Sequence, residues 1–148
     1  MIIKPPQNIA KRPKNSRTVF LAGSIEMGAA VDWQKDLGEF FEKFQFVVFN
    51  PRRDDWDSSW EQSFESPQFY QQVDWELKAL DQSHHIVMYF DPGTKSPISL
   101  LELGLYANSG KLSVICPVGF WRKGNVDIVC NKYNIPLFES IESFKNRF

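Results

Sequence analysis

Short apolar runs rich in Val, Ile and Phe alternate with segments of helical period along most of the chain. The runs that predict strands are Thr18 to Ala22, Phe46 to Phe49, His84 to Phe90, Leu112 to Cys116 and Ile135 to Phe138. Strands of this composition, separated by helices, indicate a parallel sheet that is covered on both faces. Because 43% of the 148 residues are hydrophobic, we expect one domain with a sizeable core. The predicted fold is a single-domain, Rossmann-like α/β three-layer sandwich with a five-stranded, mostly parallel sheet.

The first 17 residues differ from the rest, because they contain three prolines and most of the unbalanced basic charge. We predict a flexible amino-terminal extension over residues 1–17 and one domain over residues 18–148. Apolar runs are too short for a membrane span and the amino terminus lacks a signal-peptide core, so we expect a cytoplasmic protein. The net charge of -1 gives no reason to expect a nucleic acid or membrane partner. The contexts of Cys116 and Cys130 suggest neither a disulfide nor a metal site, and we expect no cofactor.

A helix is expected to begin near Pro97, because Ser96 can cap it and proline is tolerated at the first helical position. At 100° per residue its apolar side chains cover most of the circumference and leave a wedge with Ser99, Glu102 and Tyr106. The segment contains no Lys, Arg or second acid. Either this wedge is a solvated stripe, the usual fate of a helical Glu, or Glu102 faces a pocket; we favour the pocket.

Ligands of open parallel sheets bind beyond the carboxyl ends of the strands. The segments that follow the expected strands span residues 23–28, 50–60, 91–102 and 117–121. Gly23 to Gly28 is either a loop whose backbone N–H groups contact a ligand or a plain tight turn before a helix from Val31 to Phe44. Residues 50–66 have no apolar period but contain aromatic side chains such as Trp56. Such a loop suits stacking on a flat ring or forms a lid on its own domain.

Four motifs resemble the nucleoside 2-deoxyribosyltransferases. They are FLAGSI at residues 20–25, NPRRDDW at 50–56, QVDWEL at 72–77 and SPISLLELG at 96–104. Members of that family exchange the base of a 2'-deoxyribonucleoside through a covalent ester on the glutamate of the ELG segment, which here is Glu102. A carboxylate beside the anomeric carbon stabilises an oxocarbenium-like transition state and traps it as an ester. The resemblance therefore implies a transferase of nucleotide metabolism that acts in purine and pyrimidine salvage.

The resemblance also implies an acid on the preceding helix that positions the sugar or protonates the departing base. Glu76 takes this role, with Asp74 as the runner-up; an ordinary solvated helix face explains both acids equally well. The substrate-binding residues that it implies are Gly23, Ser24, Ile25, Asn50, Arg52, Trp56, Asp91, Ser96 and Ser99. Its members are oligomers, so we expect at least a homodimer whose small-molecule partners are a deoxynucleoside and a free base.

One position departs from the pattern of the exchange enzymes, which have an acid six residues before the nucleophile. Here that position is Ser96. Relatives that hydrolyse deoxynucleoside 5'-monophosphates have a serine in a comparable place, where it helps to hold the phosphate; otherwise Asp91 supplies the missing acid. Base exchange is thus the first hypothesis, and hydrolysis of an N-glycosidic bond is the alternative. A nucleotide-binding module without turnover is the third, because similar sheets have many functions.

Overall fold

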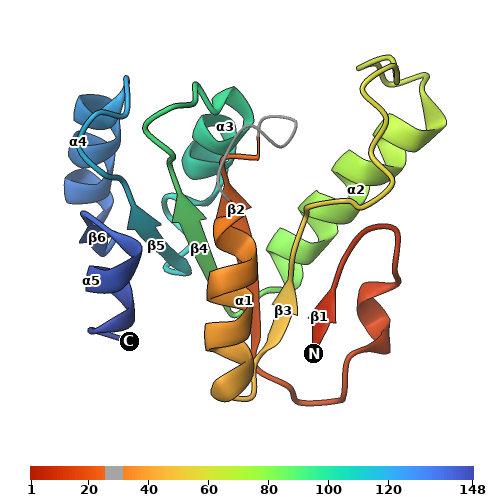
Figure 1. Cartoon of the computed structure of the whole chain (residues 1–148), viewed down its shortest axis with the longest axis horizontal. Helices are drawn as coiled ribbons and strands as arrows, with labels where there is room; N and C mark the ends of the chain where they lie inside the picture. The colour runs from red at the N-terminus through yellow and green to blue at the C-terminus, as the bar shows by residue number, and fades with distance from the viewer. Residues whose placement is uncertain (26–31) are drawn as a thin grey trace. The chain divides into compact units, whose positions relative to one another are not determined.

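The computed structural model describes residues 1–25 and 32–148, and shows an α/β chain with a six-stranded parallel sheet (Figure 1). The strand order is β1-β3-β2-β4-β5-β6. The strands are β1 (Ile2–Ile3), β2 (Thr18–Gly23), β3 (Val47–Phe49), β4 (His85–Tyr89), β5 (Leu112–Ile115) and β6 (Leu137–Phe138). The predicted fold class is confirmed, and the five predicted strands are present. The sheet has one strand more than predicted, because β1 lies in the amino-terminal segment.

The helices follow the apolar runs that the sequence predicts as strands. They are α1 (Trp33–Lys43), α2 (Pro67–Gln82), α3 (Pro97–Tyr106), α4 (Lys123–Tyr133) and α5 (Ile141–Lys145), with a 3-10 turn η1 (Ile9–Lys11). Proline occupies the first turn of both α2 and α3, where its missing N–H costs no helical hydrogen bond. Gly28 of the expected turn and Val31 of the expected helix lie outside the described residues. Among the described residues, no helix is both long and apolar enough to cross a membrane.

The amino-terminal segment takes part in regular structure. Strand β1 pairs in parallel with β3, with Ile2 opposite Val48 and Ile3 opposite Phe49. The backbone carbonyl of Gln7 accepts a hydrogen bond of 2.7 Å from the indole of Trp75. A two-residue strand is too short to give a sequence signal of its own. The flexibility of residues 1–17 concerns motion and stays a prediction.

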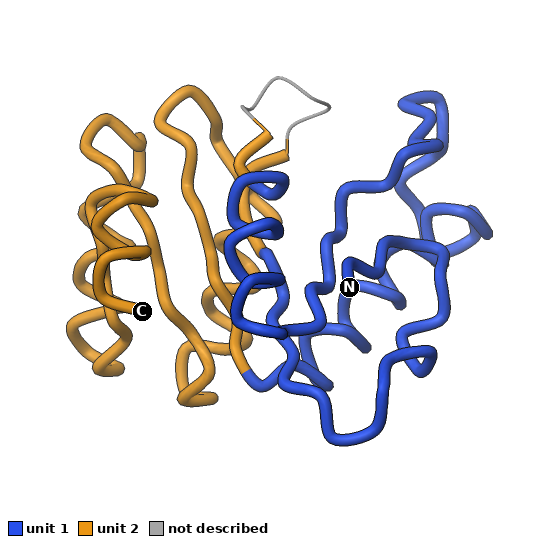
Figure 2. Tube along the Cα trace, turned by 60° about the horizontal axis from the view of Figure 1, so that its bottom comes forward, with its two compact units in different colours: residues 1–21, 34–84 blue, residues 22–33, 85–148 orange. Residues whose placement is uncertain are grey.

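The chain forms two compact units, which Figure 2 shows in different colours. Unit 1 comprises residues 1–21 and 34–84. Its core is aromatic: the ring of Trp75 on α2 lies 6.3 Å from that of Phe49 and 6.4 Å from that of Phe20. Just before β4, the hydroxyl of Thr18 lies 2.8 Å from Nδ1 of His84.

Unit 2 comprises residues 22–33 and 85–148, and therefore contains α3 with Glu102. Strands β4 and β5 pair in parallel from Ile86 opposite Leu112 to Tyr89 opposite Ile115. Their apolar side chains are buried, as expected of strands covered on both faces. Beyond the strand ends, the ring of Phe90 packs 4.8 Å from that of Phe120. This packing fixes the end of β4, from which the chain turns into α3.

Candidate functional site

Helix α3 buries its polar side and exposes much of its apolar side. Glu102 is 8% exposed and Ser99 is 5% exposed, whereas Ile98, Leu101 and Leu105 are each about 60% exposed. The alternative of a solvated polar stripe is therefore wrong for Glu102. A carboxylate is rarely this buried unless it is paired or has a chemical task. Glu102 is therefore buried, and the expectation that it faces a pocket stays a prediction.

Ser96 begins α3 in a way that the sequence did not predict. Its backbone is left-handed, with φ of 47°, and its side chain makes no hydrogen bond that caps the described helix. The expectation of a serine cap is wrong, because the Ser96 hydroxyl points to other hydroxyls: it lies 2.5 Å from Oγ of Ser24 and 2.7 Å from Oγ1 of Thr94. All three residues are buried.

Gly23 brings Ser24 close to the end of β4. Its φ is 134°, and a Cβ atom at this position would lie 2.2 Å from the carbonyl oxygen of Tyr89. Only glycine permits this approach without strain. The backbone N–H of Ser24 then donates to Tyr89 at 3.0 Å, and the Ser24 hydroxyl accepts from the backbone N–H of Asp91 at 2.9 Å. Hydrogen bonds of Ser24 therefore hold the segment after β2 against the end of β4.

Trp33 was not predicted to belong to this region. It is 1% exposed, its indole N–H donates to the carbonyl of Ser24 at 2.9 Å, and its ring lies 5.3 Å from that of Tyr89. The carboxylate of Asp91 accepts from the backbone N–H of Gly93 at 2.8 Å and so closes its own turn. Ile25 is partly buried beside Ser24 in the chain. Unit 2 thus links Ser24, Asp91 and Ser96 by hydrogen bonds, while Ser99 and Glu102 follow on α3.

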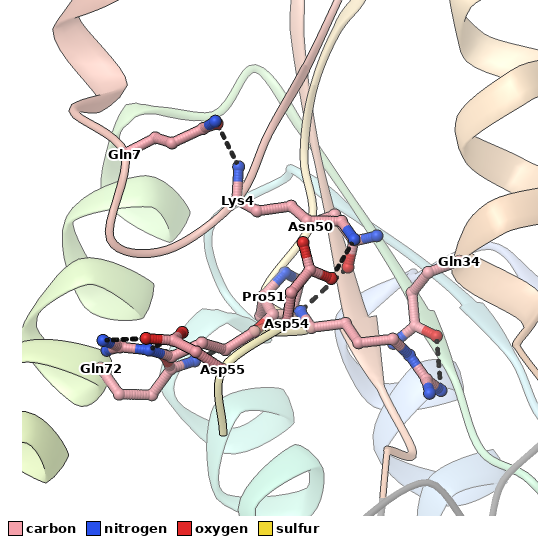
Figure 3. Close-up of polar contacts among 10 residues, drawn as sticks. Lys4, Gln7, Gln34, Asn50, Pro51, Asp54, Asp55 and Gln72 are labelled. Atoms are coloured by element: carbon pink, nitrogen blue, oxygen red, sulfur yellow. Dashed lines mark hydrogen bonds and ion pairs between the residues drawn. The ribbon is translucent and has the colours of Figure 1, made fainter. Parts of the chain in front are cut away.

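Unit 1 holds a second group of polar residues, drawn in Figure 3. Buried Asn50 accepts a hydrogen bond of 3.0 Å from the backbone N–H of Arg52 through its side-chain oxygen. The guanidinium of Arg52 donates at 3.3 Å to Gln34, whose Nε2 has no hydrogen-bond partner among the described residues. Gln34 is fully buried, and the sequence did not predict it as a site residue. The only feature that could have indicated it is an amide side chain beside Trp33 at the start of a helix.

Glu76 and Asp74 have different environments, although both lie on α2. Nε2 of buried Gln72 donates to the carboxylate of Glu76 at 2.7 Å and to the carbonyl of Pro51 at 3.0 Å. Burial raises the pKa of Glu76 from 4.5 to about 7, and the Gln72 hydrogen bond opposes this shift. Asp74 forms an ion pair of 2.6 Å with Lys78, whose side chain is mostly exposed. Glu76 therefore exchanges a proton near neutral pH, and Asp74 is bound in a surface ion pair.

The loop over residues 50–66, all of which the structure describes, contains neither helix nor strand, as expected. Trp56 is partly buried and packs edge-to-face on Trp60 at 5.2 Å. The guanidinium of Arg53 lies 4.9 Å from the Trp60 ring. These contacts stabilise the loop on itself, and a ligand role for Trp56 stays a prediction.

Two apolar hollows open on the surface. One, of about 340 Å³ in unit 1, lies along α2 and the preceding loop, and the other, of about 200 Å³ in unit 2, lies between α3 and α4. Neither hollow is lined by Glu102 or Glu76.

Comparison with known proteins gives one assignment. No curated protein matched the chain. The family described as "Nucleoside 2-deoxyribosyltransferase like" matches residues 16–120, a stretch that contains Gly23, Glu76 and Glu102. The match covers more than half of the sequence and includes all four motifs identified above. The chain therefore belongs to the nucleoside 2-deoxyribosyltransferase-like family.

Proposed function

We propose that this protein exchanges the nucleobase of 2'-deoxyribonucleosides through a covalent deoxyribosyl ester on Glu102. The family supports an enzyme of the deoxyribosyltransferase kind. The observation that carries the assignment to Glu102 is its burial on a helix that has no other charged side chain. Such an acid has a direct use in glycosyl transfer.

In the first step, a carboxylate oxygen of Glu102 attacks C1' of the sugar and forms an ester bond. The bond between C1' and the base nitrogen breaks, and its electron pair leaves with the base, which takes up a proton. In the second step, a nitrogen of the acceptor base attacks C1' and returns its proton to the group that protonated the departing base, and the ester bond breaks as Glu102 regains its negative charge. Two inversions at one carbon retain the configuration of the nucleoside.

Glu76 is the proposed helper acid. A pKa of about 7 suits a group that must hold a proton and release it near neutral pH. Asp74 is the weaker candidate because its carboxylate already forms an ion pair with Lys78 at 2.6 Å. The predicted substrate-binding residues remain proposals for mutagenesis; they are Gly23, Ser24, Ile25, Asn50, Arg52, Trp56, Asp91, Ser96 and Ser99.

The test is an incubation with deoxyinosine and free adenine, followed by chromatography. We expect the intact protein to form deoxyadenosine and hypoxanthine, and Glu102→Ala to form neither. Glu142→Ala, which removes an exposed acid of unit 2, is the matched control and should retain activity. Mass spectrometry of protein quenched with deoxyinosine alone should find one deoxyribosyl group on Glu102. Exchange that persists in Glu102→Ala would refute the assignment.

Hydrolysis is the second candidate function, because Ser96 occupies the place of an acid in the exchange enzymes. In this reaction water, instead of a base, attacks the ester on Glu102. Release of hypoxanthine without deoxyadenosine, from deoxyinosine or its 5'-monophosphate, would identify it. Nucleoside binding that is equal in the intact protein and in Glu102→Ala, without turnover by either, would indicate a binding module instead.

We also propose that the protein is a homo-oligomer and that α3 contributes to the interface. Ile98, Leu101 and Leu105 follow one another at helical spacing, and each is about 60% exposed. Exposed apolar residues arranged in such a stripe mark interaction surfaces more often than isolated ones do. The mass of the protein in solution tests this proposal.

A further inference from the structure

The hydroxyls of Ser24, Thr94 and Ser96 form a closed group in unit 2. Oγ1 of Thr94 lies 2.9 Å from Oγ of Ser24 and 2.7 Å from Oγ of Ser96, and the two serine oxygens are 2.5 Å apart. The three side chains come from the end of β2, from the turn after β4 and from the start of α3. Their residues are between 1% and 6% exposed, so the three hydroxyls are shielded from solvent.

This hydroxyl cluster, Ser24, Thr94 and Ser96, is anchored from several sides. Ser24 accepts from the backbone N–H of Asp91, and its carbonyl accepts from the indole of Trp33. Thr94 Oγ1 also lies 2.9 Å from the carbonyl oxygen of Asp91. Each contact fixes a cluster residue to the end of β4 or to the start of α1. The cluster is therefore a rigid support and not a set of loose side chains.

Helix α3 depends on this support for its starting direction. A left-handed serine is uncommon, and the side chain of Ser96 does not cap the described helix. The contacts of its hydroxyl with Ser24 and Thr94 hold the residue in this conformation instead. Replacement of a cluster hydroxyl removes one of these contacts, so the helix start can rotate.

Glu102 lies six residues beyond Ser96, which corresponds to about 9 Å along the helix axis. A tilt of about 6° at Ser96 therefore moves Glu102 by roughly 1 Å. In enzymes, a misplacement of about 1 Å can lower the rate on the order of 100-fold. The start of α3 is thus a sensitive place at which to control the geometry of the nucleophile.

We propose that Ser24, Thr94 and Ser96 are positioning residues, which hold the start of α3 so that the Glu102 carboxylate is aligned for attack on C1'. This inference rests on the proposed function. It adds a positioning role to the substrate contacts proposed above for the two serines, and it extends that role to Thr94. A residue that only binds substrate affects KM most, whereas a residue that aligns the nucleophile affects kcat.

Thr94 offers a matched pair of variants. Thr94→Val keeps the shape of the side chain and removes the hydroxyl, and Thr94→Ser keeps the hydroxyl. In the exchange of deoxyinosine with adenine, we expect Thr94→Val to lower kcat by at least about tenfold while KM stays within about threefold. Thr94→Ser should retain kcat within about threefold of the intact protein. Ser24→Ala and Ser96→Ala should lower kcat as Thr94→Val does.

A control separates positioning from a general loss of stability. The Ser83 hydroxyl is buried and donates to the carbonyl of Ala79 at 2.6 Å in unit 1. Ser83→Ala should lower the unfolding midpoint in urea and leave kcat unchanged. If Thr94→Val is unfolded at the assay temperature, folded Ser24→Ala or Ser96→Ala protein makes the same comparison with the control.

The outcomes distinguish this inference from the function on which it rests. If the intact protein forms no product, the proposed function fails and the inference fails with it. If the intact protein is active and the folded variants without a cluster hydroxyl keep full kcat, only the positioning role is refuted. A raised KM at unchanged kcat also refutes it, because that result indicates direct contact with the substrate.

Discussion

The stability of the protein should depend on pH through the carboxyl group of Glu76, which is partly buried on α2. Burial raises its pKa to about 7 in the folded protein, against 4.5 for an exposed glutamate. Because the folded state binds the proton of Glu76 more tightly than the unfolded state does, proton binding stabilises the folded protein. This contribution to the free energy of unfolding is fully present below pH 4.5. It is lost as the pH rises to 7, above which the folded protein contains a charged and desolvated group.

The magnitude follows from these two pKa values. Proton linkage gives a loss of about 2 to 3 kcal/mol in the free energy of unfolding between pH 5 and pH 8. Glu76→Gln removes the titrating group and keeps an oxygen that can accept from Gln72. We therefore expect the difference in stability between Glu76→Gln and the intact protein to grow by about 2 to 3 kcal/mol from pH 5 to pH 8.

Urea unfolding of both proteins at several pH values between 5 and 8 measures this difference. Asp74→Asn is the matched control, because Asp74 lies two residues away on α2 and forms a mostly exposed ion pair with Lys78. Its stability profile over this range should run parallel to that of the intact protein. If the profiles of Glu76→Gln and the intact protein are parallel too, burial does not raise the pKa of Glu76 and the argument for a helper acid loses its basis.

Three further predictions concern other parts of the chain. Gly23→Ala should destabilise the protein by more than about 2 kcal/mol in urea unfolding, because its Cβ would lie 2.2 Å from the carbonyl oxygen of Tyr89. Normal stability of this variant would refute the close approach of Gly23 to Tyr89. Leu101→Glu should reduce the mass measured by light scattering to that of a monomer, and an unchanged mass would exclude this stripe from an interface. Burial raises the thiol pKa values of Cys116 and Cys130 to about 12 and 11, so both should resist alkylation at pH 8 until the protein unfolds; rapid modification of the folded protein would contradict this.

Several predictions from the sequence agree with the structure because they depend on local chemistry. The apolar runs form strands, and α3 begins at Pro97, because proline already has the backbone conformation of a first helical residue. The loop after Asn50 was predicted from its lack of an apolar period. Strand β1 was missed because two residues show no alternation, and its pairing with β3 is a contact between distant parts of the chain.

The residues of the candidate site also differ in whether a local sequence pattern or only a tertiary contact reveals them. Glu102 was singled out because it is the lone acid of a helix, and this pattern is visible in the sequence. Gln34 and Trp33 were missed because a buried amide and a hydrogen-bonded indole look like ordinary residues of an amphipathic helix. Their contacts with Arg52 and Ser24 connect segments that the sequence does not pair.

The sequence alone determined the fold class and the start of α3 at Pro97, because periodicity and proline act within a few residues. It also singled out Glu102 as the candidate nucleophile, which stays a prediction. Only the tertiary structure decided that α3 buries Ser99 and Glu102 and exposes its leucines. It also decided that Ser96 joins a hydroxyl cluster in place of a cap, and that the pKa of Glu76 rises. These outcomes depend on neighbours that are distant in sequence, since the cost of desolvation and the choice of hydrogen-bond partner are set by the surrounding atoms.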